Sequence, residues 1–515
     1  MRRSFAGVAA VAVALAAHAA GGTAGVAESV ACEVAAIEAK APPGTTVTAA
    51  AMVDAAEGRP RFCQVDGHAA STGNTVNFQL GLPENWNGKF LFLGVGGLGG
   101  SLAKLDPGLA RGYATATTDT GHRASEPDWA ANRAKEIDYG YRGTHVSTVA
   151  TKALTASFYG APPKYAYFEG CSNGGRQALM EVQRYPDDFD GVIGGHPATG
   201  TPMQVGRAVV YQRMLASPDA YLTPSAIELV SKASLAACDK ADGLEDGLVS
   251  DPRPCRFDPA ALVCRGAATD GCLTPGQVAT VAQIYRGVRT PDGQIYAHGF
   301  PPGHEGGATG WTQWIAGQTP PAAQEGGSLA YTGTRLPSGY GLMDFNFQFL
   351  ALENDEPGYG WRQFDVARDL PRMRTMTEIL SPLDADLRPF AKSGGKLLMY
   401  HGWSDPGISA LGTLDYYERV VRTVGGQSTT DAFVRAYFVP GMHHCGGGPG
   451  PNTFAMLPAL EAWVEKGVAP GSVKASRVVD GKIVRTRPLC PHPQVARYLG
   501  MGSIDEAASF VCAAP

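Results

Sequence analysis

Short apolar runs recur along the chain, and each ends in a segment rich in glycine or polar residues. Four of them stand out: 89–93, 164–168, 396–400 and 436–439. Apolar runs of this length, bounded by turn residues, are typical of buried strands. Helical patterns alternate with them, notably over 143–158 and 411–424. The alternation predicts an α/β fold in which a mostly parallel sheet is flanked by helices.

The segments that follow these four runs carry the candidate chemistry. They are 94–100, with five glycines, and 170–175, 401–405 and 440–445, with serine, histidine, aspartate or cysteine. In open parallel sheets, ligands bind in the loops beyond the carboxyl ends of the strands. We therefore expect these segments to meet at one edge of the sheet and to form the functional site there.

The pattern changes between 201 and 374. Cysteines cluster at 238, 255, 264 and 272, aromatic residues cluster from 311 to 361, and glycine- and proline-rich stretches separate them. The alternation of strands and loops resumes afterwards. We interpret 201–374 as a large inserted lid domain, with 20–200 and 375–515 as the two parts of one core domain.

The composition is that of a folded chain with a large apolar core. Of 515 residues, 44% are hydrophobic and only 18% are charged, which excludes a disordered chain. The formal net charge of −5, without a basic run, argues against a nucleic-acid partner. The 66 glycines and 37 prolines indicate many turns and long connections.

The first residues predict export. Arg2 and Arg3 precede the apolar stretch 5–17, and Ala17 and Ala19 provide the small residues of a signal-peptidase site. The stretch is shorter than the roughly 20 residues that span a bilayer. We therefore predict a signal peptide over 1–19 and a soluble, secreted or periplasmic protein without a membrane partner. In that compartment ten cysteines indicate five disulfides, and the lack of a CxxC pair argues against a zinc site.

The clearest motif is Gly170-Cys171-Ser172-Asn173-Gly174, a G-x-S-x-G sequence directly after a predicted strand and before a predicted helix. In this context the motif forms a nucleophile elbow, a tight turn that lifts the serine hydroxyl above the sheet. Ser172 is the predicted nucleophile. The amide of Asn173, at the start of the helix, is a predicted oxyanion donor.

A catalytic serine needs a base, and on this fold the acid and then the histidine follow it in the chain. Asp405 and His444 lie in predicted loops in that order. Asp405 could alternatively cap a helix or form an Asx turn. His443 competes with His444, and sequence position by itself does not separate the two.

Two cysteines favour His444. Cys171 precedes the predicted nucleophile and Cys445 follows His444. If Ser172 and His444 share a hydrogen bond, these neighbours lie within the roughly 4.4–6.8 Å Cα separation that a disulfide requires. We expect a Cys171–Cys445 bridge that ties the base to the elbow.

The chain resembles the tannase and feruloyl esterase family, whose relatives include a hydrolase of terephthalate monoesters. The resemblance rests on the segments 84–88, 118–122, 170–176, 401–405 and 440–445. It implies an α/β-hydrolase core with an inserted lid, Ser172, Asp405 and His444 as the triad, and the Cys171–Cys445 bridge. It also implies that Gly97 supplies the second oxyanion amide, which fits the need for a donor from the loop after the first parallel strand.

The acidic segment 238–248 is a candidate calcium site, because hard divalent cations take carboxylate and carbonyl oxygens. EF-hand spacing is not met, and a solvated acidic turn is the alternative. The resemblance implies a structural Ca²⁺ held by the side chains of Asp239, Asp242 and Asp246 and the carbonyls of Leu244 and Leu248. It also implies a Cys238–Cys255 bridge around the loop.

Proximity and resemblance together pair Cys32 with Cys63, Cys264 with Cys272, and Cys490 with Cys512. No organic cofactor is expected.

The sequence is less specific about the substrate. Seven lid aromatics are candidates for stacking on an aromatic acyl group: Trp311, Trp314, Phe345, Phe347, Phe349, Tyr359 and Trp361. Met343 stands near the position where relatives specific for terephthalate have an arginine. We therefore expect a small aromatic ester, a hydroxycinnamate or gallate, such as one derived from a plant polymer. Alternatives are a terephthalate monoester hydrolase, an exported serine peptidase and a catalytically silent calcium-dependent binding protein. The oligomeric state stays open.

Overall fold

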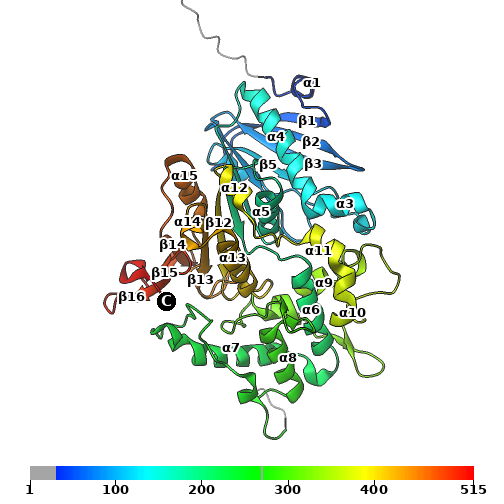
Figure 1. Ribbon diagram of the computed structural model, residues 1–515, viewed down its shortest axis with the longest axis vertical. Coiled ribbons are helices and arrows are strands. Elements are labelled where there is room, and N and C mark those ends of the chain that lie inside the picture. The colour runs from blue at the N-terminus through cyan, green and yellow to red at the C-terminus, as the bar shows by residue number, and fades with distance from the viewer. Residues whose placement is uncertain (1–29, 268–270) are drawn as a thin grey trace, which may run out of the picture.

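The computed structural model describes residues 30–267 and 271–515 (Figure 1). Its centre is a nine-stranded sheet in the order β1-β2-β3-β5-β4-β6-β7-β12-β13. The strands are β1 (Thr45–Val53), β2 (Phe62–Ser71), β3 (Asn74–Pro83), β4 (Lys89–Leu93), β5 (Ala114–Thr118), β6 (Tyr165–Cys171), β7 (Gly191–Gly195), β12 (Lys396–Gly402) and β13 (Val434–Val439). Pairing is antiparallel from β1 to β5 and parallel from β5 to β13.

Helices cover both faces of this sheet because its strands are apolar on both sides. In β4, Phe90 and Phe92 point into one core and Leu91 points into the other. The first core is closed by α4 (Gly143–Tyr159), α5 (Asn173–Arg184) and α13 (Ala410–Val424), and the second by α15 (Met456–Lys466). The expected α/β-hydrolase core is confirmed.

The four strands expected from sequence are β4, β6, β12 and β13, and the two expected helices are α4 and α13. Strands β1 to β3, β5 and β7 were not anticipated. The sequence of β7 is Gly-Val-Ile-Gly-Gly, whose glycines hide the apolar pattern of a buried strand. Four more C-terminal strands form two hairpins: β14 (Val473–Val479), β15 (Lys482–Leu489), β16 (Val495–Tyr498) and β17 (Phe510–Ala513).

The segment between β7 and β12 forms a separate helical layer below the sheet (Figure 1). Its larger helices are α6 (Thr201–Met214), α7 (Pro224–Cys238), α8 (Pro275–Arg286) and α9 (Ser338–Phe349), followed by α10 (Val366–Asp369) and α11 (Arg374–Leu380). One buried apolar cluster consists only of residues between Val205 and Met373. This lid segment therefore has a core of its own.

The remaining short elements connect these layers. The helices are α1 (Val34–Glu38), α2 (Asp106–Leu109), α3 (Arg133–Ile137), α12 (Arg388–Lys392) and α14 (Gln427–Asp431). The lid also contains four strands of two or three residues: β8 (Val288–Arg289), β9 (Ile295–Ala297), β10 (Ala322–Ala323) and β11 (Leu329–Ala330). The predicted signal peptide lies outside the described residues. Within the described part of the chain, every helix falls short of the length and hydropathy needed to cross a membrane.

All ten cysteines are paired, in the five combinations expected. The bridges are Cys32–Cys63, Cys171–Cys445, Cys238–Cys255, Cys264–Cys272 and Cys490–Cys512. Four of them close loops of at most 31 residues, whereas Cys171–Cys445 spans 274 residues. That one bridge links the end of β6 to the loop after β13 across the whole lid insertion.

Candidate active site

Ser172 sits at the turn between β6 and α5 in a strained conformation. Its φ of 64° and ψ of −119° place it where residues with a side chain rarely occur. The turn is tight: a Cβ atom at Gly170 would lie 2.4 Å from the carbonyl oxygen of Gly174, and one at Gly175 would lie 2.2 Å from that of Gly195. Gly170 of the motif and Gly175 directly after it are therefore required by close backbone approach, and the tight turn raises the serine above the sheet.

Helix α5 also holds the glycine-rich loop that follows β4. The Asn173 side chain donates from Nδ2 to the carbonyl of Val95 at 3.0 Å, and Gln177 Oε1 accepts from the Val95 amide at 3.0 Å. Gly97, two residues further on, has a φ of 59° and lines the same cavity as Ser172 and Asn173. Among the described residues, neither the Gly97 amide nor the Asn173 amide donates to a protein group. Both are free to bind an oxyanion.

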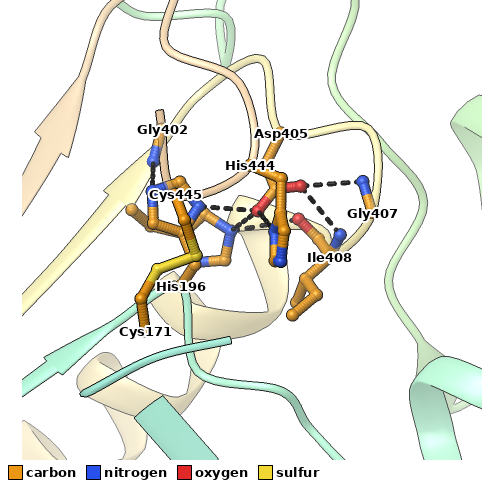
Figure 2. The surroundings of a disulfide bond; sticks show 9 residues. Cys171, His196, Gly402, Asp405, Gly407, Ile408, His444 and Cys445 are labelled. Atoms are coloured by element: carbon orange, nitrogen blue, oxygen red, sulfur yellow. Dashed lines mark hydrogen bonds and ion pairs between the residues drawn. A yellow bond between two sulfur atoms is a disulfide. The ribbon is translucent and has the colours of Figure 1, made fainter. Parts of the chain in front are cut away.

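Asp405 lies buried in the loop after β12 and uses its two oxygens differently (Figure 2). Oδ1 accepts from the amides of Gly407 at 2.7 Å and Ile408 at 3.0 Å, so the Asx turn considered from sequence is present. Oδ2 accepts from His444 Nδ1 at 2.8 Å. Burial disfavours the charged carboxylate, but the His444 charge and the imidazole hydrogen bonds outweigh it and hold the pKa of Asp405 well below its usual range.

The disulfide fixes His444 beside the elbow. The Cα atoms of Cys171 and Cys445 are 6.1 Å apart, and Figure 2 shows the bridge next to the His444–Asp405 pair. The indole of Trp314, from the lid, contacts the His444 ring edge to face with centroids 4.5 Å apart. Among the described hydrogen bonds there is none between Ser172 Oγ and His444. Such catalytic hydrogen bonds often tighten only when substrate binds.

His443 points away from this site. It accepts from Thr309 Oγ1 at 2.7 Å and donates from Nε2 to the His304 carbonyl at 2.9 Å, so it joins the base loop to the lid. Burial lowers the pKa of His443 and keeps the ring neutral. Of the two adjacent histidines, only His444 reaches Asp405.

Sequence reasoning missed two further histidines on the same carboxylate. His196, directly after β7, donates from Nδ1 to Asp405 Oδ2 at 2.6 Å, and His401 lies 3.1 Å from that oxygen through Nε2. Burial, reinforced by the neighbouring His401, lowers the pKa of His196 to about 3. His401 belongs to the candidate segment 401–405 identified from sequence. The glycine-rich run before His196 gave no sign of a buried strand, so His196 was not recognised as a residue at a strand end.

Two adjoining cavities open at the site. A narrow one, with space for roughly three water molecules, is lined by Ser172, Gly97 and Asn173, the nucleophile and oxyanion donors predicted from sequence. A wide one of about 580 Å³ lies between the lid and the loop after β12, within the size range of small-molecule sites. The two share Met203, Arg207 and Trp314 as walls.

Of the seven lid aromatics considered from sequence, only Trp314 lines either cavity. Trp311, Phe347 and Trp361 are buried in the lid core, and Tyr359 packs against it. Phe345 and Phe349 pack instead on a cluster that contains Trp129 and Tyr139. These six side chains stabilise the lid. Met343 is likewise fully buried in the lid core and does not reach a cavity.

The acidic loop after α7 has ligand chemistry that fits calcium. Burial raises the pKa of Asp242, and the negative charges of Asp246 and Asp239 raise it further, so the three carboxylates repel one another. A divalent cation would relieve that repulsion. The loop is also held from outside: Arg487 of β15 pairs with Asp246, and Arg485 donates to the Asp246 carbonyl at 3.1 Å. The calcium site remains a proposal that rests on this donor set.

Comparison with known proteins gives a family match over most of the chain. Residues 63–513 match the family model described as tannase and feruloyl esterase. The chain is 34% identical to a mono(2-hydroxyethyl) terephthalate hydrolase of Piscinibacter sakaiensis, covering 92% of this chain and 89% of that protein. It is 30% identical to a probable feruloyl esterase B-2 of Aspergillus terreus, covering 86% and 84%. The crystal structure of feruloyl esterase B from Aspergillus oryzae superposes with a TM-score of 0.81 at 26% identity, over 93% of this chain and all of that one.

Proposed function

The chain belongs to the tannase and feruloyl esterase family and is a carboxylic ester hydrolase, and from this premise we propose that it hydrolyses hydroxycinnamoyl or galloyl esters through a serine acyl-enzyme. The observation that carries the mechanism is the His444–Asp405 hydrogen bond at 2.8 Å, held beside the Ser172 turn by the Cys171–Cys445 bridge. We also propose that the enzyme is exported, as its five disulfides favour an oxidising compartment.

In the proposed reaction His444 takes the proton from Ser172 while the serine oxygen attacks the ester carbonyl carbon. The amides of Asn173 and Gly97 donate to the oxyanion, and Asp405 stabilises the imidazolium. The imidazolium then protonates the alcohol oxygen as the ester bond breaks. Water, deprotonated by His444, attacks the acyl-serine, and Ser172 recovers its proton as the aromatic acid leaves.

The two cavities suggest where the acyl group and the alcohol of the substrate bind. The narrow cavity contains the nucleophile, and leucines from three elements line it, namely Leu98, Leu342, Leu350 and Leu380. This wall suits an aromatic acyl group, for which the cavity has to widen beyond its present space for roughly three water molecules. The wide cavity presents Gln294, His298, Ser409 and Asp415, which suit an alcohol rich in hydroxyl groups. We propose that the acyl group binds in the first and the alcohol in the second.

A panel of esters tests this assignment. The purified enzyme should hydrolyse methyl ferulate or methyl gallate faster than a terephthalate monoester and faster than an aryl amide. Ser172→Ala should reduce turnover by at least about 10³-fold while the melting temperature stays unchanged. A preference for the amide would assign a peptidase, and a preference for the terephthalate monoester would assign that hydrolase instead. If the wild type neither turns over any member nor reacts with a fluorophosphonate, the silent calcium-dependent binding protein becomes the better assignment.

A further inference from the structure

Asn346 is a buried polar residue in the apolar wall of the narrow cavity. It lies on lid helix α9, and Leu342, Asn346 and Leu350, the residue directly after the helix, line the cavity at four-residue spacing. Met343 and Phe347, on the adjoining side of the helix, pack into the lid core. Asn346 is only 5% exposed. Asn346 therefore lines the same cavity as Ser172.

The Asn346 side chain has an unused hydrogen-bonding capacity. Its Oδ1 is buried and has no hydrogen-bond partner in the described part of the chain. Among the described residues that line this cavity, no other side chain has a buried polar atom in that condition. A buried amide without a partner is unfavourable, so such a group calls for an explanation.

The cationic groups of the same cavity are already engaged. Arg176 donates to Asn173 Oδ1 at 2.8 Å and to the carbonyls of Tyr139 and Gly140 at 2.6 Å each. Arg207 donates to Gln204 Oε1 at 3.0 Å and to the Gly407 carbonyl at 2.8 Å. The guanidinium groups of this cavity therefore already donate to protein acceptors. The neutral amide of Asn346 has an acceptor without a partner, so it is the group left to bind a substrate atom.

We propose that Asn346 determines specificity by binding a hydroxyl group on the ring of the acyl moiety. A hydroxyl both donates and accepts, so it can satisfy the acceptor and a donor of one amide. A carboxylate or a methyl ether lacks the donor that Oδ1 requires. The inference rests on the proposed function and narrows it, since it selects phenolic acyl groups over unsubstituted and carboxylated ones.

The test measures the ratio of kcat/KM for a hydroxylated ester to kcat/KM for the unsubstituted ester. The substrates are methyl cinnamate and its 3-hydroxy and 4-hydroxy derivatives, and the enzymes are the wild type and Asn346→Leu, which keeps the volume and removes the amide. The wild type should prefer at least one hydroxylated ester by about tenfold in kcat/KM, and the variant should reduce that preference to within about twofold. Leu350→Ala is the matched control on the same wall, and it should lower all three rates together.

Two results overturn the inference while the proposed function stands: a wild type without a hydroxyl preference, or an Asn346→Leu enzyme that keeps it. Hydrolysis of an aliphatic ester without any aryl ester overturns the inference and the proposed function together. Melting temperatures are recorded for each variant. Should Asn346→Leu fail to fold, Asn346→Ala provides the same ratio, because it also removes the amide.

Discussion

His196 donates a hydrogen bond of 2.6 Å to Asp405, onto the same carboxylate oxygen that His444 contacts at 2.8 Å. The other ring nitrogen of His196 accepts from the Gly402 amide at 3.3 Å, which fixes the neutral tautomer with its proton on Nδ1. His196 is thus a positioning residue: it holds the acid that orients the base.

Removing this hydrogen bond should alter the pH dependence of the reaction. Because His196 withdraws charge from Asp405, its loss leaves a stronger negative charge opposite His444. In His196→Ala we expect the acid limb of the kcat/KM profile to move to higher pH by up to about one unit. His196→Gln, which retains a donor, should restore the limb toward the wild type. A purely structural role would lower kcat without moving the limb.

The two adjacent histidines offer a matched pair of variants. His444→Gln removes the proposed base and should lower kcat by at least about 10³-fold with little change in melting temperature. His443→Gln breaks the bonds to Thr309 and the His304 carbonyl, so it should lower the melting temperature and leave kcat within about tenfold. Steady-state kinetics and calorimetry separate these effects, and the reverse pattern would assign the base to His443.

The disulfide beside the base should support activity as well as stability. Cys171→Ala/Cys445→Ala should lower kcat by about tenfold or more under conditions where the protein is folded, because the His444 loop is no longer held at the elbow. The control is Cys490→Ala/Cys512→Ala, which removes a bridge between the C-terminal strands. That variant should lose stability, about 2–5 kcal/mol, and keep kcat. Full turnover in the first double variant argues against the bridge as a catalytic support.

Chelation tests the proposed calcium site. Treatment with EDTA should lower the melting temperature by several degrees, and added Ca²⁺ should restore it while Mg²⁺ should not. Asp242→Asn removes one of the three mutually repelling carboxylates and should abolish the response to chelator. A melting temperature that is the same with and without EDTA would remove calcium from the description of this enzyme.

The buried carboxyl group of Glu136 should make the free energy of unfolding depend on pH. Burial raises the pKa of Glu136 to about 7, although Arg133 lies 2.9 Å away and opposes the shift. The native state therefore holds this proton between about pH 4.5 and 7, where the unfolded chain has lost it, so stability falls as pH rises through that range. Glu136→Gln mimics the protonated form. It should match the wild type near pH 4.5 and exceed it by about 1–2 kcal/mol at pH 8 in urea unfolding. Equal slopes with pH in the two proteins would contradict the assignment.

The sequence by itself determined the elements that carry the chemistry. The strands that end at Leu93, Cys171, Gly402 and Val439 were visible because apolar runs end at glycines or polar residues. The motif at Ser172 identified a nucleophile because local backbone geometry needs those glycines, and that signal is contained in a few consecutive residues. The cysteine pairs were likewise anticipated, with help from the family resemblance.

Only the tertiary structure decided what surrounds those groups. His196 and Asp405 are 209 residues apart, and they meet because β7 and β12 are adjacent parallel strands whose carboxyl ends share one edge. Packing decides which positions of α9 meet the lid core: Met343 lies in that core and Asn346, three residues further on, lines the narrow cavity. Local patterns specify elements through short-range geometry, whereas partners across the sheet and the lid depend on packing between segments that sequence order does not bring together.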